Sequence, residues 1–186
     1  MVDVREAAAY RTGHLPGACS APLETLDGLL CGKATAPLPQ MVVYGSGPRD
    51  PRPYAAARRL LREGAADVRV LRAGIRGWLD AEQPLEIAPE DVPASATGAG
   101  PGVLVDVRSR DAASRGRPAG SVCVPVEEFR WQDFDEAVAL PPLYFVGSDA
   151  GDPGPEKIVE RIRLLRSARG LRTPVEFHVV RGGFEA

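Results

Sequence analysis

The most constraining feature of this sequence is an internal repeat. Residues 2–5 (Val-Asp-Val-Arg) recur as residues 105–108, at an offset of 106 − 3 = 103 positions. The same offset aligns further identical pairs over the next twenty positions: Ala9 with Ala112, Gly13 with Gly116, Gly17 with Gly120, Pro22 with Pro125 and Glu24 with Glu127. A repeat of this kind indicates one structural unit that is built twice. Any chemistry of the unit must therefore be sought at two matching places.

Composition narrows the class of protein. With 186 residues, of which 44% are apolar, two units of about 90 residues can each bury a modest core. The net charge is −2 and no basic block occurs, so nucleic acid is not an expected partner. The longest apolar stretch, residues 137–147, is too short to span a bilayer, and residues 1–5 read as a strand rather than a signal peptide. Three cysteines argue against a disulfide framework and favour the cytoplasm.

Hydrophobic patterns predict strands that alternate with helices in both copies. In the first copy we expect strands at 1–4, 41–44 and 68–71, an extended segment at 18–22, and helices at 6–11, 23–31, 54–62 and around Trp78. In the second we expect strands at 103–107, 143–146 and 175–180, an extended segment at 122–126, and a helix that carries Ile158, Ile162 and Leu165 on one side. This alternation predicts an α/β fold with a mainly parallel sheet in each unit, flanked by helices on both faces.

The order of motifs resembles that of the rhodanese-like domain family. The first copy contains Val-Asp-Val-Arg at 2–5, Gly-His-Leu-Pro-Gly-Ala at 13–18, Met-Val-Val-Tyr at 41–44 and Ala-Gly-Ile-Arg-Gly-Trp at 73–78. The second copy follows the pattern more loosely, with Val-Asp-Val-Arg at 105–108, Gly-Arg-Pro-Ala-Gly at 116–120, Leu-Tyr-Phe-Val at 143–146 and Arg-Gly-Gly-Phe at 181–184. The resemblance implies a tandem sulfurtransferase architecture of two rhodanese-like α/β/α units.

The resemblance also sets expected boundaries. We expect unit 1 at residues 1–83, short at its N-terminal end because it begins on the Asp-Val-Arg strand. Residues 84–101 form a linker rich in Ala, Pro, Gly, Ser and Thr, within which 85–87 is a candidate first strand of unit 2 and 89–92 a helical turn. Unit 2 then occupies residues 102–186 and is short at its C-terminal end.

In active relatives of this family, the loop after the Val-Val-Tyr strand starts with a cysteine that carries sulfane sulfur as a persulfide. Backbone N–H groups and a helix N-terminus stabilise such a thiolate and the anionic donor. The lowered pKa of the thiol makes the nucleophile available. Here the corresponding loops, 45–53 and 147–154, start with Gly45 and Gly147 and contain no cysteine.

The sequence therefore predicts a catalytically degenerate tandem protein, a binding or scaffold module linked to sulfur metabolism. The alternative is a sulfurtransferase that uses a displaced cysteine, with Cys31 beside Lys33 as a weak candidate, or a partner's cysteine. The scattered cysteines and histidines have no metal-ligand spacing, so neither a metal site nor a cofactor is expected.

The first loop retains residues suited to anions. The candidate set is Gly45, Ser46, Gly47, Arg49 and Arg52. Glycines allow close approach of backbone N–H groups and arginine donates in pairs, although Asp50 partly offsets the charge. The expected partner is thiosulfate, sulfate or phosphate, with a protein as the other candidate. The second loop carries Asp149 and Asp152 without arginine, so no anion site is expected there.

The remaining polar residues are expected to be structural. His14 should hydrogen-bond locally within its turn, and His178 should lie in the core of an apolar strand. The Asp-x-Arg pairs at 3/5 and 106/108 should form ion pairs that fix the following turn. Cys19 and Cys123, in the extended segments after the turns, are expected to be buried thiols.

Overall fold

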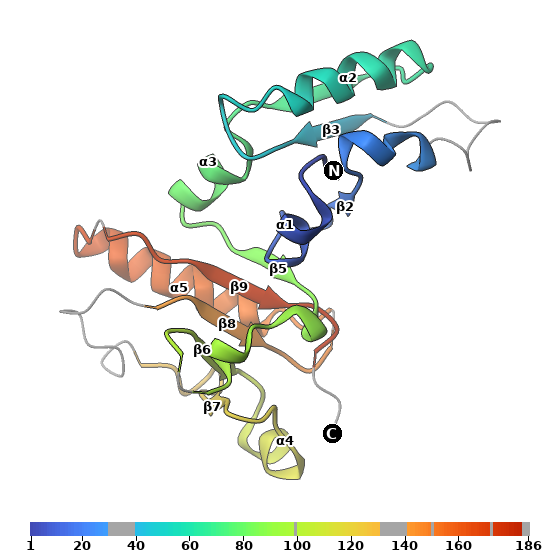
Figure 1. The fold of residues 1–186 in the computed structure, drawn as a ribbon. Helices are drawn as coiled ribbons and strands as arrows, with labels where there is room; N and C mark the ends of the chain where they lie inside the picture. The colour runs from blue at the N-terminus through green and yellow to red at the C-terminus, as the bar shows by residue number, and fades with distance from the viewer. Residues whose placement is uncertain (30–39, 99, 131–140, 150, 172, 184–186) are drawn as a thin grey trace. The chain divides into compact units, whose positions relative to one another are not determined.

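The computed structural model describes residues 1–29, 40–98, 100–130, 141–149, 151–171 and 173–183 (Figure 1). The chain divides into two compact units, Met1–Ala81 and Glu82–Ala186. Each unit is an α/β structure built on a parallel sheet that is flanked by helices, which confirms the predicted fold class.

The first unit contains a four-stranded parallel sheet in the order β2-β1-β3-β4. Its elements are β1 (Val2–Asp3), α1 (Ala7–Arg11), β2 (Cys19–Ser20), the 3-10 helix η1 (Leu23–Leu29), β3 (Met41–Tyr44), α2 (Arg52–Arg62), β4 (Val68–Leu71) and α3 (Gly74–Asp80). Helix α2 places Ala56, Ala57 and Leu60 against Val43 of β3, where all four are buried. Spacing of three and four residues brings these side chains onto one helix face.

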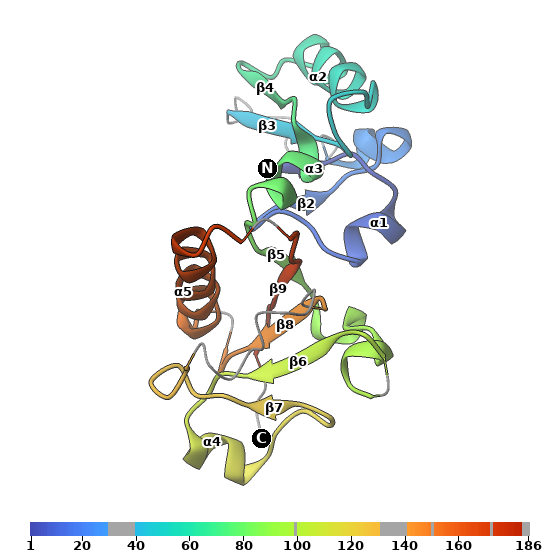
Figure 2. The same ribbon diagram turned by 90° about the vertical axis from the view of Figure 1, so that its left-hand side faces the viewer.

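The second unit contains a five-stranded parallel sheet in the order β5-β9-β8-β6-β7 (Figure 2). Its elements are β5 (Leu85–Ile87), the 3-10 helices η2 (Pro89–Asp91) and η3 (Ala94–Ala96), β6 (Val103–Asp106), α4 (Arg110–Arg115), β7 (Val122–Cys123), β8 (Leu143–Val146), α5 (Gly154–Ala168) and β9 (Phe177–Val180). Four strands, β7-β6-β8-β9, repeat the order of the first sheet, and β5 is added beyond β9.

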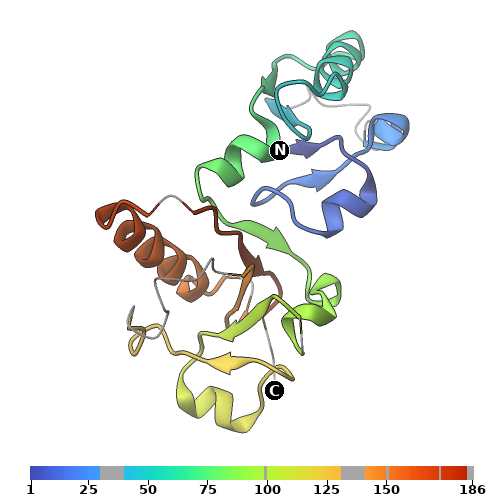
Figure 3. The ribbon, with the colours of Figure 1, turned by 60° about the vertical axis from the view of Figure 1, so that its left-hand side comes forward.

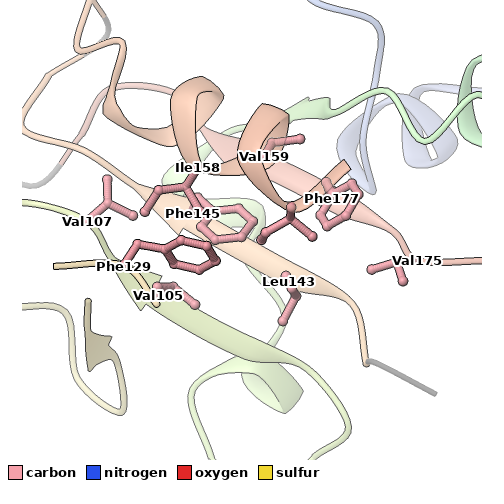
Figure 4. Packing of buried hydrophobic residues seen from close by; sticks show 10 residues of the cluster. Val105, Val107, Phe129, Leu143, Phe145, Ile158, Val159, Val175 and Phe177 are labelled. Atoms are coloured by element: carbon pink, nitrogen blue, oxygen red, sulfur yellow. The ribbon is translucent and has the colours of Figure 1, made fainter. Parts of the chain in front are cut away.

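Helix α5 covers one face of this second sheet (Figure 3). Ile158 and Ile162 of α5 pack with Phe145 of β8 and Phe177 of β9, and none of the four has measurable exposure (Figure 4). The two phenylalanine rings lie 6.4 Å apart between centroids, within the range at which aromatic pairs attract. On the opposite sheet face, Ala96 of η3 joins a second group of buried residues.

Several element ends differ from the expected ones. The helix expected at 54–62 begins at Arg52, because Pro53 suits the first turn, where its missing N–H costs nothing. The extended segment expected at 122–126 pairs only over Val122–Cys123, and the helix expected at 23–31 is a 3-10 helix over Leu23–Leu29. Helix α4 was not expected, although Ser109 caps it by accepting a hydrogen bond from the Ala112 N–H at 3.2 Å.

Candidate functional site

The first candidate loop joins β3 to α2 and is fixed by the start of α3. The N–H of Ile75 donates to the Gly45 carbonyl at 3.0 Å, and the N–H of Arg76 donates to the Ser46 carbonyl at 3.2 Å. Gly74 has a φ of +57°, and a Cβ there would lie 2.5 Å from the Gly45 carbonyl oxygen and 2.6 Å from the Gly47 nitrogen. Only glycine allows this close approach. The start of α3 therefore holds the loop in a single conformation, and we call this contact the glycine clamp.

The Asp50 carboxylate is the central acceptor of this loop. It accepts hydrogen bonds from the Ser46 N–H at 2.8 Å, from the Arg52 N–H at 3.0 Å, and from Nε and Nη2 of Arg52 at 2.9 and 2.8 Å. The Arg52 guanidinium, helped by these backbone N–H groups, lowers the pKa of Asp50 to about 2. The Asp50 side chain is only 5% exposed. The N–H and guanidinium donors of this loop therefore already bind an anion, the side chain of Asp50.

This carboxylate fills the space next to Gly45. A Cβ on Gly45 would overlap the Asp50 Oδ2 atom and would lie 2.9 Å from Cγ of both Asp50 and Pro53. Distances below about 3 Å are far inside van der Waals contact between carbon atoms. No side chain fits at position 45 while Asp50 keeps its place.

The second loop, between β8 and α5, repeats this arrangement at an offset of 152 − 50 = 102 residues. The Asp152 carboxylate accepts from the Ser148 N–H at 2.7 Å and from the Gly154 N–H at 2.8 Å. A Cβ on Gly147 would lie 2.7 Å from Asp152 Oδ2. Burial alone would raise the pKa of Asp152, but these N–H donors, with Lys157 nearby, lower it below its ordinary value. Gly154 stands where the first loop has Arg52, so this carboxylate has no guanidinium partner of that kind.

The glycine clamp is repeated as well. Gly183 has a φ of +65°, and a Cβ there would lie 2.4–2.5 Å from backbone atoms of Ser148 and Asp149. Gly74 follows the end of β4 by the same number of residues as Gly183 follows the end of β9. In both units, the backbone just after this strand therefore holds the candidate loop.

Four of the five candidate residues of the first loop, Ser46, Gly47, Arg49 and Arg52, lie together at the surface, whereas Gly45 is buried. Arg49, Arg52 and Arg76 border an open hollow beside Ser46 and Gly47. Arg52 is already engaged: its Nη2 donates to Asp50 and also to the Ser46 Oγ at 3.0 Å. An anion from solution would have to displace Asp50 from these donors, so binding at this loop stays a prediction.

The Asp-x-Arg pairs and the two histidines that were expected to be structural lie as predicted. Arg5 pairs with Asp3 and donates to the Gly13 carbonyl at 2.8 Å, which fixes the turn. Arg108 repeats this with Asp106 and the Gly116 carbonyl at 2.7 Å. Nδ1 of His14 lies 3.2 Å from the Tyr10 carbonyl oxygen, and the His14 ring stacks on the Tyr10 ring. His178 lies within β9 and is 3% exposed.

The expectation of buried thiols is wrong for Cys19. This residue is exposed and Cys123 is half-buried, because β2 and β7 are two-residue edge strands that have a neighbour on one side only. Cys31 lies outside the described residues. Within the described ranges, no three His, Cys, Asp or Glu side chains gather closely enough to hold a metal ion. No helix in the described part of the chain has both the length and the apolar character needed to cross a bilayer.

Sequence reasoning missed the roles of Asp50 and Asp152. Both loops share the pattern Gly-Ser-x-x-x-Asp-Pro, at 45–51 and 147–153, and this pattern was the available signal. An aspartate two residues before a helix start can accept from the first helical N–H, while its second oxygen reaches back to the end of the strand.

Several known proteins are similar to this chain or to part of it. The family profile described as "Rhodanese-like domain" matches residues 1–81. Among solved structures, the rhodanese-like domain of the Alr3790 protein from Anabaena sp. is 29% identical with a TM-score of 0.41, over 46% of this chain and 84% of that chain. Thiosulfate sulfurtransferase from Pseudomonas aeruginosa is 23% identical with a TM-score of 0.40, over 98% of this chain and 37% of that chain. A probable thiosulfate sulfurtransferase is 18% identical with a TM-score of 0.32, over 98% and 91%. No curated protein matches the chain.

Residues 1–81 therefore form a rhodanese-like domain. The loop between β3 and α2 is the place in this domain where the strand-end and helix-start N–H groups converge, and Asp50 occupies it.

Proposed function

We propose that this chain is a non-catalytic tandem of two rhodanese-like units, a binding or scaffold module linked to sulfur metabolism. The observation that carries the proposal is the carboxylate of Asp50 beside Gly45, matched by Asp152 beside Gly147. Sulfur transfer through a persulfide needs a thiolate held by positive donors. In both loops the donors instead hold a carboxylate, and the neighbouring position has no side chain.

The repeated geometry supports the tandem part of the proposal. The Asp-x-Arg pairs with their turn carbonyls, the Gly-Ser-x-x-x-Asp-Pro loops and the clamping glycines recur in both units. The shared strand order supports it further. Divergent copies of one fold explain all four similarities at once.

The test is a thiosulfate:cyanide assay on the full chain, with thiocyanate as the product. We expect no thiocyanate above the buffer rate for the wild type. The matched variants are Cys31→Ser, Cys19→Ser and Cys123→Ser. Turnover that survives dialysis and disappears in one of these variants would overturn the proposal and support a displaced sulfur carrier.

The alternative of a sulfurtransferase with a displaced cysteine gains one observation, the exposure of Cys19 on β2. Its Sγ donates to the Met1 carbonyl oxygen at 3.3 Å, an acceptor and not one of the positive donors that persulfide chemistry needs. We therefore keep the non-catalytic reading.

A further inference from the structure

The second unit contains an apolar hollow of about 350 Å³ on the sheet face opposite α5. Its floor is formed by Leu104 of β6, Val146 of β8 and Val180 of β9, all of them buried. Segments around η2 and η3 and the turn 116–120 form its walls, with Thr97 and Pro118 among the lining residues. Sites for small molecules are commonly apolar hollows of about 300–1,000 Å³, so this one has the size and lining of a binding site.

The walls of this hollow are fixed by direct contact between two of its segments. Gly120, at the end of the turn, has a φ of +74°, and a Cβ there would overlap the carbonyl group of Thr97, directly after η3. The backbone N–H of Thr97 donates in turn to the Ala94 carbonyl at 3.2 Å. The hollow is therefore a preformed part of the fold.

In the first unit, a tyrosine ring fills the equivalent place. Tyr44 pairs with the aspartate of the Asp-x-Arg motif in the first sheet, and Val146 pairs with the aspartate of the repeated motif in the second. The two residues therefore hold the same position in the two copies. Tyr44 has no measurable exposure, and its phenol oxygen accepts a hydrogen bond from the Leu15 N–H at 3.1 Å. Its ring thus spans the space between β3 and the turn 13–17.

The second unit lacks both this ring and the donor that holds its hydroxyl group. Val146 has no ring, and Leu15 corresponds to Pro118, since 118 − 103 = 15. Proline has no N–H to donate. The hollow lies between Val146 and Pro118, where the first unit has the tyrosine ring between its counterparts of these two residues. A ring without a hydroxyl group at this end fits the space best, because a buried hydroxyl would lose its partner.

We propose that this hollow binds the uncharged aromatic ring of a small molecule, in the place that the Tyr44 ring occupies in the first unit. Burial of the ring against Leu104, Val146 and Val180 provides the affinity, since removal of apolar surface from water is favourable. Apolar cavities lined by aliphatic side chains bind benzene in the same way. The lining residues are not among the donors that hold Asp50 and Asp152, so this site goes beyond the proposed function and does not depend on the chemistry of either loop.

The experiment titrates toluene into the full chain and follows the methyl signals by proton–carbon correlation NMR. We expect saturable shifts at the methyl groups of Leu104, Val146 and Val180, with half-saturation at about 1 mM. Val146→Phe restores a ring on the floor of the hollow and should weaken toluene binding about tenfold or more. Ala119→Phe places a ring at the exposed rim, leaves the core unchanged, and should also weaken binding.

The matched control is Ala66→Phe, the same added ring at an exposed position of the first unit, which should leave toluene binding unchanged. Three results would overturn the proposal. The methyl groups of the floor show no saturable shifts up to the solubility limit of toluene; a folded blocking variant binds toluene as tightly as the wild type does; or toluene binds only after Phe184→Ala, which would show that Phe184, a residue outside the described ones, is the occupant.

Discussion

Asp50 combines three kinds of donor in one carboxylate: the guanidinium of Arg52, a strand-end N–H and a helix-start N–H. Hydrogen bonds to charged groups contribute about 1.5–3 kcal/mol each, and removing one partner of a buried set leaves the others unsatisfied. The Asp50 carboxylate is therefore expected to stabilise the loop as well as to fill it.

Asp50→Asn should lower the free energy of unfolding in a pH-dependent way. The folded pKa of Asp50 is about 2, below its ordinary value of 3.8. The stabilisation of about 2 kcal/mol is therefore fully present above pH 3.8 and is lost as the pH falls through the folded value. Urea unfolding of both proteins between pH 7 and pH 2.5 should show a difference that is constant at first and shrinks below pH 4.

The control is Asp67→Asn. Asp67 also pairs with an arginine two residues later, Arg69, but the Asp67 side chain is 45% exposed. This substitution should change stability by well under 1 kcal/mol at any pH. An Asp50→Asn difference that persists undiminished at pH 2.5 would contradict the assigned role of the carboxylate.

Gly45→Cys should destabilise the first unit without producing a reactive thiolate. The new Cβ collides with Asp50, and displacing that carboxylate breaks its hydrogen bonds. The negative charge of Asp50 and the prolines at 48, 51 and 53, which have no N–H to donate, should keep the thiol pKa at or above about 8.5. The rate of iodoacetamide alkylation against pH measures this pKa. A thiol that titrates below neutrality would show that the loop still stabilises an anion. The double variant Gly45→Cys/Asp50→Gly, which removes the collision with Asp50 but leaves the one with Pro53, should recover part of the lost stability.

Residue roles that depend on a local pattern could be predicted from the sequence. The Asp3–Arg5 pair and the local contact of His14 are examples, since both are set within a few residues along the chain. The exposure of Cys19 could not be predicted, because it depends on β2 being an edge strand. The position of the Asp50 carboxylate could not be predicted from charge alone, since it depends on the loop's path in three dimensions.

At the scale of elements, one glycine in each unit packs against the candidate loop. Gly74, after β4, meets the loop between β3 and α2, and Gly183, after β9, meets the loop between β8 and α5. Gly183 and Gly170 provide a matched pair within the second unit, with φ of +65° and +68°. A Cβ on Gly183 meets the Ser148 and Asp149 backbone, whereas a Cβ on Gly170 meets nothing within 4 Å.

Gly170→Ala should therefore cost only about 1–2 kcal/mol, the penalty of a left-handed backbone for a non-glycine residue. Gly183→Ala should cost more than about 4 kcal/mol, because backbone atoms must also move. Chemical denaturation monitored by the far-UV signal compares the two variants. Equal losses would show that the clamp contributes nothing beyond the φ angle.

Elements with strong apolar patterns were predictable, and those fixed by capping or pairing were not. Strands β3, β4, β5 and β8 have the bounds that their apolar runs predict. Helix α4 is six residues long and has no buried side chain, so its formation depends on the Ser109 cap instead of an apolar stripe. The repeat offset applied to α1 would have indicated it, since 7 + 103 = 110.

At the scale of the whole molecule, each unit buries its own core. Leu60 belongs to the cluster around Val43, and Ile162 to the cluster around Phe145, and no residue is common to the two clusters. Leu60→Ala should lower stability by about 2–5 kcal/mol through lost burial and the cavity that remains. Ile162→Ala should do the same in the other unit.

Hydrogen exchange of the native chain separates the two effects. Leu60→Ala should speed exchange of the β1 and β3 amides with little change in β8 and β9, and Ile162→Ala should show the reverse. Uniform acceleration in both sheets after either substitution would show that the two cores open as one cooperative unit.

The carboxylate beside Gly45 also governs which mutational paths lead to a thiol in this loop. A cysteine that arrives first collides with Asp50, and loss of Asp50 first removes the hydrogen bonds that order the loop. Each order passes through an intermediate less stable than the present chain, and proteins have only a few kcal/mol to lose. Gly147 and Asp152 impose the same two-step path on the second loop. A cysteine at Gly45 or Gly147 is therefore expected to require a second substitution at Asp50 or Asp152 to be tolerated.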